Sequence, residues 1–404
     1  MTNIIGRIQE FNKTRDPGKV SLKYTAMGKN LFRFFRGTAH IYWEDLAAAR
    51  LSLTSPLVWG CGDLHLENFG SYKSDNGLVY FDLNDFDDAA LMPLHWEIAR
   101  MLTSIYVAFK SLKIDQKKAD KLAMMFVKSY KEFLGSGKAL YIERQIAQGI
   151  VREFLEQVET RKYKELVEKK THRPKSDNEI LIDGKRHLAL EKDFGIKLKK
   201  HMQAWLKEDE RSPYNYKVID AAFRVAGTGS LGLERYILLL KSSNENGVKY
   251  LLVEMKEAAP SAAVPFLGIE QPARSNEAER VIELQKQMQN VSPALLSHVH
   301  FENKDFIVEE MQPEKDSINF KLLKGRYRDM CRVIIDMARL TAAAQIRSAG
   351  RRGSTGIDEL IAFSENNELE KSLIEYALEA ATQTELYFQA FCRHIHTGET
   401  IIRA

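Results

Sequence analysis

Two polar clusters in the first quarter of the chain contain the residue types that bind hard cations and move protons. The first, GDLHLENF, holds Asp63 and Asn68, and the second, FDLNDFDD, holds Asp82 and Asp85. Carboxylate and amide oxygens are the ligands that Mg²⁺ prefers in proteins. If the two clusters lie side by side, they predict a magnesium site that serves a bound nucleotide.

A β-hairpin between the two clusters is the element that would bring them together. Phe69–Lys73 and Leu78–Leu83 have strand-like sequences, and Ser74-Asp75-Asn76-Gly77 supplies the turn. Because a hairpin folds back on itself, the residues before its first strand meet the residues after its second. The sequence therefore predicts one acidic site at the open end of this hairpin.

A glycine-rich segment much later in the chain is a candidate for the phosphate-binding half. Three strands are expected over Val218–Val225, Leu233–Lys241 and Tyr250–Lys256, with GTGSLG between the first two. In a dinucleotide fold such a segment joins a strand to a helix, whereas here it joins two strands. That context matches the phosphate-covering loop of protein kinases, and the other interpretation is an ordinary glycine-rich hairpin. The candidate phosphate-binding residues are Gly227, Thr228, Gly229, Ser230 and Gly232.

Lys256 ends the third of these strands and precedes a helix expected from about Asn276 to Asn290. It could simply mark the exposed end of the strand. In protein kinases a lysine at this position binds the nucleotide phosphates and pairs with a glutamate of the next helix. We favour Glu283 as that glutamate, with Glu279 as the alternative, since the choice depends on the phase of the helix.

The spacing D-x-x-x-x-N between Asp63 and Asn68 is that of the kinase catalytic loop. On this interpretation Asp63 orients the acceptor hydroxyl or accepts its proton, and Asn68 holds a metal ion. A second metal-binding aspartate is expected after the hairpin. The downstream sequence favours Asp85 for this role, and the shorter distance along the chain favours Asp82. His65 is expected to be a structural residue of the loop.

Taken together and in their order along the chain, these motifs resemble those of known protein families. GDLHLENF followed by DFDDA and WEIA resembles the catalytic segment of the aminoglycoside-phosphotransferase and choline-kinase branch of the protein-kinase-like superfamily. The larger pattern is similar to an uncharacterised bacterial family with FxFxRG, GDxHxxNFG and FDxNDFD signatures, matched here at Phe32–Gly37, Gly62–Gly70 and Phe81–Asp87. Cys61 and Gln345 stand where these families usually have histidine.

The order of the motifs is reversed relative to ordinary kinases, because Asp63, Asn68 and Asp85 precede Gly227 and Lys256. The resemblance therefore implies an α+β, bilobal, protein-kinase-like fold that is circularly permuted, with a helix-rich large lobe. It also implies that Met311 and its neighbours contact adenine. We expect four parts: an N-terminal extension and helix (1–55), a catalytic segment with large-lobe helices (56–210), a small β lobe (211–315) and C-terminal helices (316–404).

Composition excludes several other classes of protein. The net charge of +4 is the small difference between 59 basic and 55 acidic residues, so it gives no specific nucleic-acid signal. Three scattered cysteines do not make a disulfide framework. The N-terminus lacks the apolar core of a signal peptide, and no apolar run is long enough to cross a membrane. A cytoplasmic protein with no membrane partner is the expectation.

The function expected from these features is an ATP- and Mg²⁺-dependent phosphotransferase. Its acceptor is an unknown hydroxyl compound, either a small molecule or a protein, and the helical region 96–210 is expected to form part of the acceptor pocket. The alternatives are a nucleotidyltransferase and a nucleotide-binding pseudokinase of the same fold. A metal-dependent phosphoesterase is less favoured, because such sites need more histidine ligands. Residues 1–30 are expected to lie over the surface.

Overall fold

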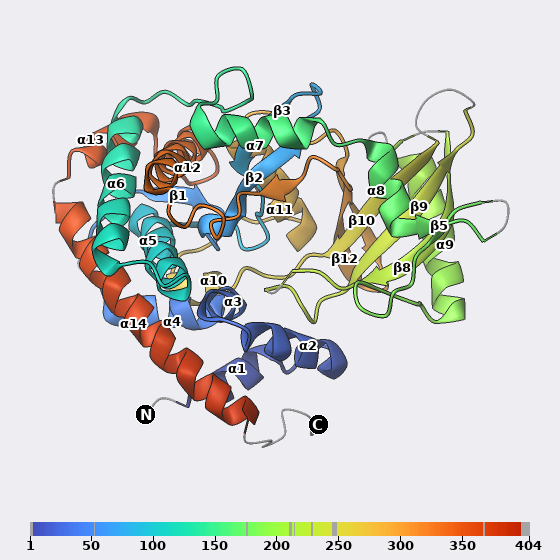
Figure 1. Ribbon diagram of the computed structural model, residues 1–404, viewed down its shortest axis with the longest axis horizontal. Helices are drawn as coiled ribbons and strands as arrows, with labels where there is room; N and C mark the ends of the chain where they lie inside the picture. The colour runs from blue at the N-terminus through green and yellow to red at the C-terminus, as the bar shows by residue number, and fades with distance from the viewer. Residues whose placement is uncertain are drawn as a thin grey trace.

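The computed structural model describes residues 3–396 of the 404, apart from 52, 175–176, 210–211, 214, 228, 245–248 and 367. The fold is mixed α+β, and all pairs of named strands are antiparallel. Figure 1 shows the largest sheet at one end of the molecule and most of the helices at the other. The α+β fold class expected from the sequence is confirmed.

The largest sheet has six strands in the order β11-β12-β10-β9-β8-β7. The three expected strands are present as β8, β9 and β10, and helix α11 lies in the connection from β10 to β11. Strand β11 was not expected from the sequence. The bounds are β7 (His187–Leu188), β8 (Tyr216–Arg224), β9 (Arg235–Ser242), β10 (Tyr250–Glu257), α11 (Glu277–Met288), β11 (Leu296–Phe301) and β12 (Lys304–Glu310).

Both faces of this sheet are covered by apolar contacts. Along β9, Leu238 belongs to the core that includes α9 (Lys192–Glu208), and Leu239 belongs to the opposite core, which includes Val167 of α8 (Tyr163–Lys170). Successive side chains of a strand point to opposite faces, so the apolar run in β9 fills both cores. A short strand pair, β5 (Thr171–His172) and β6 (Glu179–Ile180), follows α8.

The expected hairpin is present as β2 (Phe69–Lys73) and β3 (Val79–Leu83), with Phe69 paired to Leu83. A 3₁₀ turn at Leu66–Asn68 precedes it. Strand β13 (Asp316–Ser317) joins β2, and β1 (Leu57–Gly60) pairs with β4 (Ala90–Pro93) around the hairpin. The two polar clusters are thereby held between β1 and β4.

The helices of the opposite end enclose one large apolar core. Helix α5 is buried along nearly its whole length and packs against α6 and α14, while α12 packs against α6 and β1. Within the described residues, no helix is both long and apolar enough to cross a membrane. The bounds are α5 (Leu94–Ser111), α6 (Gln116–Gly135), α7 (Gly149–Glu159), α10 (Val264–Leu267), α12 (Tyr327–Ser348), α13 (Ile357–Ser364) and α14 (Glu368–His396).

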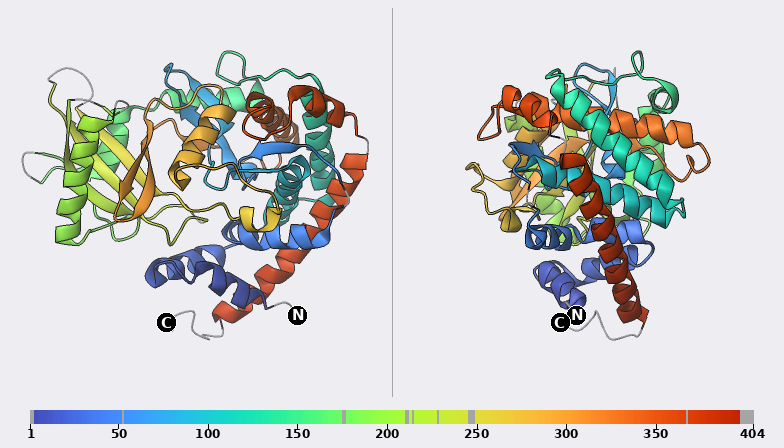
Figure 2. Two further views of the ribbon diagram at one scale, coloured as in Figure 1. Left: turned by 180° about the vertical axis from the view of Figure 1, so that it is seen from behind. Right: turned by 90° about the vertical axis from the view of Figure 1, so that its left-hand side faces the viewer.

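The N-terminal residues fold into helices and do not lie loosely over the surface, so that expectation was wrong. Helices α1 (Ile4–Asn12) and α2 (Pro17–Met27) precede α3 (Leu31–Gly37) and α4 (Ala39–Ala49). Ile4 and Ile8, four residues apart on one helix face, are buried in a small core with Phe391 of α14. Figure 2 shows α1 and α2 beside the far end of α14.

Candidate functional site

The acidic half of the site, after β3, and its basic half, at the end of β10, lie side by side. Lys256, at the end of β10, reaches the carboxylates that follow β3: its Nζ is 3.7 Å from Asp85 Oδ1 and forms a closer ion pair with Asp87. The lysine side chain is 12% exposed. Segments that are far apart in the sequence therefore meet at one charged site between the sheet and the hairpin.

The electrostatics of this contact favour the ionised forms of Lys256 and Asp85. Desolvation opposes ionisation of Asp85, but the charge of Lys256, the Asp87 N–H and two nearby arginines together outweigh it and lower the pKa of this carboxyl to about 2. Burial and the charge of Asp85 raise the pKa of Asp87. Burial also opposes the charge of Lys256, yet Asp85 and Asp87 raise the pKa of its ammonium overall. The ionisation of each of these three side chains therefore depends on the charges of the other two.

Further cations line the same face of the sheet. Arg235 lies opposite Lys256 in the β9–β10 register, and Glu254 lies on the same face of β10 as Lys256. Glu254 forms ion pairs with Arg235, at 3.2 Å, and with Arg224 of β8. Burial opposes ionisation of Glu254, but the two arginines lower the pKa of its carboxyl to about 2. Glu309 of β12 lies opposite Glu254, so this face of the sheet carries both cations and anions.

Asp63 is held by a buried arginine that the sequence analysis did not single out. Arg100 of α5 has a side chain with no exposed surface, and its Nε and Nη2 donate to Asp63 Oδ1 at 3.0 and 2.7 Å. Its guanidinium carbon lies 3.7 Å from the centre of the Phe35 ring. Asp63 Oδ2 does not share these bonds and lies 3.7 Å from His65 Nε2. One carboxylate oxygen is therefore fixed, and the other is left for a second partner.

The backbone before Asp63 is anchored by Glu97, also on α5. The amide N–H of Cys61 donates to Glu97 Oε1 at 2.8 Å, and that of Gly62 donates to Oε2 at 3.4 Å. Gly62 has φ +86°, and a Cβ there would overlap the carbonyl of Asp88, so this position requires glycine. Burial raises the pKa of Glu97 to about 6. Glu97 and Arg100 are three residues apart on α5, and both anchor the loop that contains Asp63.

Asn68 and His65 complete the loop. The Asn68 side chain donates to the backbone carbonyls of Asp63 and Asp85, each at 3.2 Å, and accepts the Asp85 N–H at 2.9 Å. It therefore ties the start of the first cluster to the second. His65 Nδ1 accepts the Glu67 N–H at 3.1 Å, and burial lowers the pKa of its ring well below the ordinary range. The expectation of a structural His65 agrees with these contacts.

Asp82 does not reach the site and is corrected as a metal candidate. Its side chain is 1% exposed and forms an ion pair with Arg347 of α12, at 3.2 Å from Nη2 to Oδ2. Asp82 Oδ1 accepts the Leu83 N–H. Asp82 lies within β3, and Asp85 lies three positions later, beyond the end of that strand. The two carboxylates therefore face different surroundings. Asp82 ties the hairpin to α12, and Asp85 faces the cavity.

The expected ion pair between Lys256 and Glu283 is not formed. Glu283 accepts from Arg274 at 3.1 Å and from Arg352 at 3.3 Å. Glu279 accepts the Ser275 N–H at 2.8 Å. The face of α11 that shares a cavity with Lys256 presents Val281 and Gln285. A step of two residues rotates the side chain by about 200° in an α-helix, so neither glutamate faces the lysine.

The glycine-rich loop connects β8 to β9 and lies over the acidic cluster. Gly227 and Gly232 have φ values of +74° and +103°, which favour glycine. Gly227, Gly229 and Ser230 line the small cavity that also contains Asp63 and Asp85. Thr228 lies outside the described residues. The loop is thus placed where backbone N–H groups can approach a phosphate.

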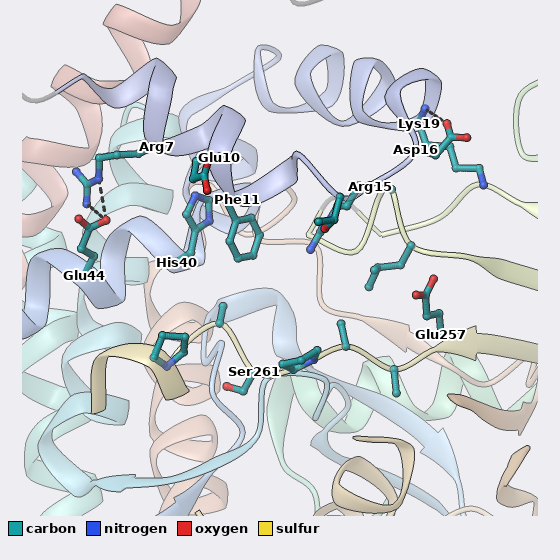
Figure 3. A pocket seen from close by; sticks show the side chains of 18 of the residues that line it. Arg7, Glu10, Phe11, Arg15, Asp16, Lys19, His40, Glu44, Glu257 and Ser261 are labelled. Atoms are coloured by element: carbon teal, nitrogen blue, oxygen red, sulfur yellow. Dashed lines mark hydrogen bonds and ion pairs between the residues drawn. The ribbon is translucent and has the colours of Figure 1, made fainter. Parts of the chain in front are cut away.

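Three adjoining cavities surround these residues. One of about 440 Å³ lies between the sheet and the hairpin and is lined by Lys256, Asp85 and Met311. A narrow one of about 90 Å³ contains Asp63 and the glycine-rich loop. The third, about 1110 Å³, lies between α1–α2 and the segment 257–266 (Figure 3). Residues of the region 96–210, expected to form part of the acceptor pocket, line the cavity of about 440 Å³ at Leu166 and Lys170 and do not line the cavity of about 1110 Å³.

Several residues of the site were missed because their roles depend on long-range contacts. Asp87 and Asp88 were not assigned to the site, but Asp87 pairs with Lys256, and the two aspartates line the narrow cavity. Burial and the charge of Asp63 raise the pKa of Asp88 to about 6. Cys61 lines the narrow cavity, whereas Gln345 lies in the core and accepts the hydroxyl of Tyr130.

A family comparison now places the chain. Residues 15–394 match the model of a family described as an uncharacterized protein conserved in bacteria, DUF2252. The chain belongs to this family. Neither the curated proteins nor the solved structures give a match. Among the described residues, the chain has no group of three or more His, Cys, Asp and Glu side chains placed to hold a metal ion by themselves.

Proposed function

We propose that this DUF2252 chain is an ATP- and Mg²⁺-dependent phosphotransferase with a circularly permuted, protein-kinase-like fold. The observation that carries the proposal is the 3.7 Å approach of Lys256 to Asp85, beneath a glycine-rich loop that joins two strands. In protein kinases these parts hold the phosphates and their metal ions. Here they come from segments in the reverse order and still meet.

The cavity of about 440 Å³ is assigned to the nucleotide. Met311 and its neighbours Glu310 and Gln312 also line it, and they would contact the base. Lys256 and Arg235 would bind the phosphates, and Gly227, Gly229 and Gly232 would cover them. This volume is within the usual range for small-molecule sites.

The residues present fit a magnesium ion bound together with a nucleotide. Mg²⁺ is commonly held by one or two carboxylates plus the phosphates of the substrate, and it does not need a complete protein cage. The Asp85 carboxylate is half exposed toward the cavity. Asn68 Oδ1 accepts the Asp85 N–H at 2.9 Å and the Asn84 N–H at 3.4 Å, so it would contact the ion by giving up the longer of these two bonds. When bound there, the ion would neutralise charge on the phosphates.

Phosphoryl transfer would then proceed with Asp63 beside the acceptor. The acceptor hydroxyl oxygen forms a bond to the terminal phosphorus as the bond from that phosphorus to the leaving oxygen of ADP breaks. The free Oδ2 of Asp63 accepts the hydroxyl proton, while Arg100 holds Oδ1. Catalysis of this kind depends on positioning and on stabilisation of charge.

The position of helix α12 beside strand β1 supports the proposed permutation. Helix α12 packs against β1, the strand that leads into the loop containing Asp63, although α12 lies near the end of the chain. In an unpermuted kinase order a long helix of the large lobe would precede the catalytic loop. Here the two elements are neighbours in space without being joined by the chain. The first part of the chain thus takes the place that follows α12.

A thermal-shift measurement tests the proposal directly. Mg²⁺ and ATP should stabilise the wild type against unfolding and should not stabilise Lys256→Met or Asp85→Asn. Transfer of label from γ-labelled ATP, but not from α-labelled ATP, is expected. If the wild type gains no stability from the nucleotide, the proposed site is wrong, and transfer from the α position alone would make the protein a nucleotidyltransferase.

A further inference from the structure

Arg15 and Lys23 form a second group of cations, separate from Lys256. Arg15 lies between α1 and α2, and Lys23 lies within α2, where it is 1% exposed. Both side chains line the narrow cavity that contains Asp63. The N-terminal helices therefore bring two positive charges to the narrow cavity beside Asp63, and neither residue lines the assigned nucleotide cavity.

These two cations lack the carboxylate partners that buried cations usually have. Lys23 Nζ donates to Asn12 Oδ1 at 3.1 Å, and Arg15 Nη1 donates to the carbonyls of Gly229 and Leu231 at 3.2 and 3.0 Å. Neither cation forms an ion pair among the residues that the structure describes. Burial lowers the pKa of both, and the charge of Arg15 lowers that of Lys23 further. The charge of Asp88 offsets part of both cations, and Glu257 offsets part of Arg15, but neither carboxylate is within ion-pair distance. Because partly compensated buried charge is costly, a bound anion would stabilise this pair further.

An independent observation at the same place is the state of His40. Its side chain is buried, 5% exposed, and neither ring nitrogen has a hydrogen-bond partner among the described residues. Burial lowers the pKa of the ring to about 2, so His40 is neutral, with one unused donor and one unused acceptor. Its ring stacks on Phe11 at 3.7 Å, and Figure 3 shows both beside the cavity together with Arg15.

The largest cavity continues from this group of residues. Arg15, His40 and Phe11 line both the narrow cavity and the one of about 1110 Å³, so the two spaces adjoin. The larger space also has apolar walls at Pro260 and Phe266. Its volume is sufficient for a ligand of several rings or a substituted sugar. A molecule seated there can extend toward Asp63.

We propose that this cavity binds the acceptor, and that the acceptor is a hydroxyl compound that carries a phosphate monoester. Arg15 and Lys23 bind its phosphate, and His40 hydrogen-bonds one of its hydroxyl groups. Two adjacent cations match the charge of a phosphate monoester, about −1.5 to −2 at pH 7, better than the single charge of a carboxylate. The assignment of the ligand as acceptor rests on the proposed phosphotransferase function.

Binding of inorganic phosphate to the full chain tests this site. The titration is done by calorimetry on the wild type, Lys23→Met and the control Lys29→Met, which removes an exposed lysine that does not line these cavities. The wild type and Lys29→Met should bind phosphate with and without saturating Mg²⁺ and the ATP analogue AMP-PNP. Lys23→Met should bind it at least about tenfold more weakly, because a charge-assisted contact is lost, while remaining folded in a thermal melt.

The same titrations contain the results that would overturn the inference. Equal binding by Lys23→Met and wild type, no binding by the wild type, or equally tight binding of acetate would each remove the phosphate site. Phosphate that binds with Mg²⁺–ADP but is excluded by AMP-PNP would assign the cations to the donor's terminal phosphate instead. Lys256→Met separates the two proposals, since it should lose AMP-PNP binding and keep phosphate binding.

Discussion

Two buried lysines of this chain, Lys256 on the sheet and Lys23 in the N-terminal helices, are in opposite electrostatic states. Both lose hydration on burial. Lys256 contacts Asp85 and Asp87, which raise the pKa of its ammonium, whereas Lys23 contacts Asn12 and its pKa is lowered. The difference shows that the charge state of a buried lysine depends on its partners more than on its depth. A buried lysine whose charge is neutralised by carboxylates can have a purely structural role. A buried lysine without an ion-pair partner indicates that an anion binds beside it.

The largest effect is expected from Asp63→Asn, which extends the comparison to a third buried cation. Arg100 has no exposed side-chain surface, and Asp63 is its carboxylate partner. Removing that charge leaves the guanidinium buried and unpaired, so unfolding should become easier by roughly 3–5 kcal/mol. Phosphate transfer should fall by about 10²–10⁴-fold. Urea denaturation and the transfer assay measure these effects, with Asp75→Asn in the exposed hairpin turn as the control.

Lys256→Met should strongly reduce the rate of phosphate transfer, and it should cost less stability than Asp63→Asn. Loss of one preorganised cation at the phosphates should lower the transfer rate roughly 10²–10³-fold. The fold should lose only roughly 1–3 kcal/mol, because Asp85 is half exposed and water can solvate it. Lys241→Met is the matched control, because it removes a half-buried lysine of the neighbouring strand β9 that also has a carboxylate partner, Asp177. Nucleotide-dependent stabilisation that persists in Lys256→Met would contradict the role assigned to this lysine.

Asp87→Asn should make Lys256 resemble Lys23. With one carboxylate removed, the pKa of the Lys256 ammonium should fall, and the fold should lose about 1 kcal/mol. NMR of the labelled lysine side chains during a pH titration would follow the change at Lys256. If the Lys256 signal titrates as in the wild type, Asp85 alone sets its charge state.

Lys23→Met should stabilise the protein at neutral pH. Methionine has a similar length and fills the buried site without a charge, so the free energy of unfolding should rise by about 1–2 kcal/mol. The comparison with Lys256→Met is then one of opposite sign. A loss of stability comparable to that of Lys256→Met would mean that Lys23 has a carboxylate partner after all. Urea denaturation at pH 7 provides the measurement.

The smallest expected effect is the pH dependence of that gain. Because the pKa of Lys23 is lowered in the folded protein, the unfolded chain binds the proton more tightly between the lowered pKa and the ordinary value of 10.5. Wild-type stability from this group therefore rises with pH in that window, and the advantage of Lys23→Met should shrink. Arg15 and Asp88 also face Lys23 and are present in both proteins, so the difference between the two stability curves isolates the lysine.

Local sequence patterns predicted much of the fold. The hairpin β2–β3, the three strands around the glycine-rich loop and helix α11 follow from residue spacing and turn chemistry, which act over a few positions. The N-terminal helices were missed because their apolar faces are short. Strand β11, with histidines within its apolar alternation, was missed as well.

The candidate site was predicted only in part, for a physical reason. The types and spacing of Asp63, Asn68 and Asp85 are local, and the sequence showed them. Which carboxylate contacts Lys256 depends on the phase of α11 and on the end of a strand. The pairing expected for Glu283 was therefore wrong, and the choice between Asp82 and Asp85 stayed open. Arg100 acts across 37 positions, and no local pattern indicates such a contact.

The reversed order of the two halves has a consequence for synthesis of the chain. Asp85 and Asp87 leave the ribosome before Lys256, and at about 5–20 residues per second the interval is roughly ten to thirty seconds. During that time the hairpin exists without the cation that neutralises it. Closure of the site therefore depends on the last-made half of the protein, and nascent chains that end before β10 cannot assemble it.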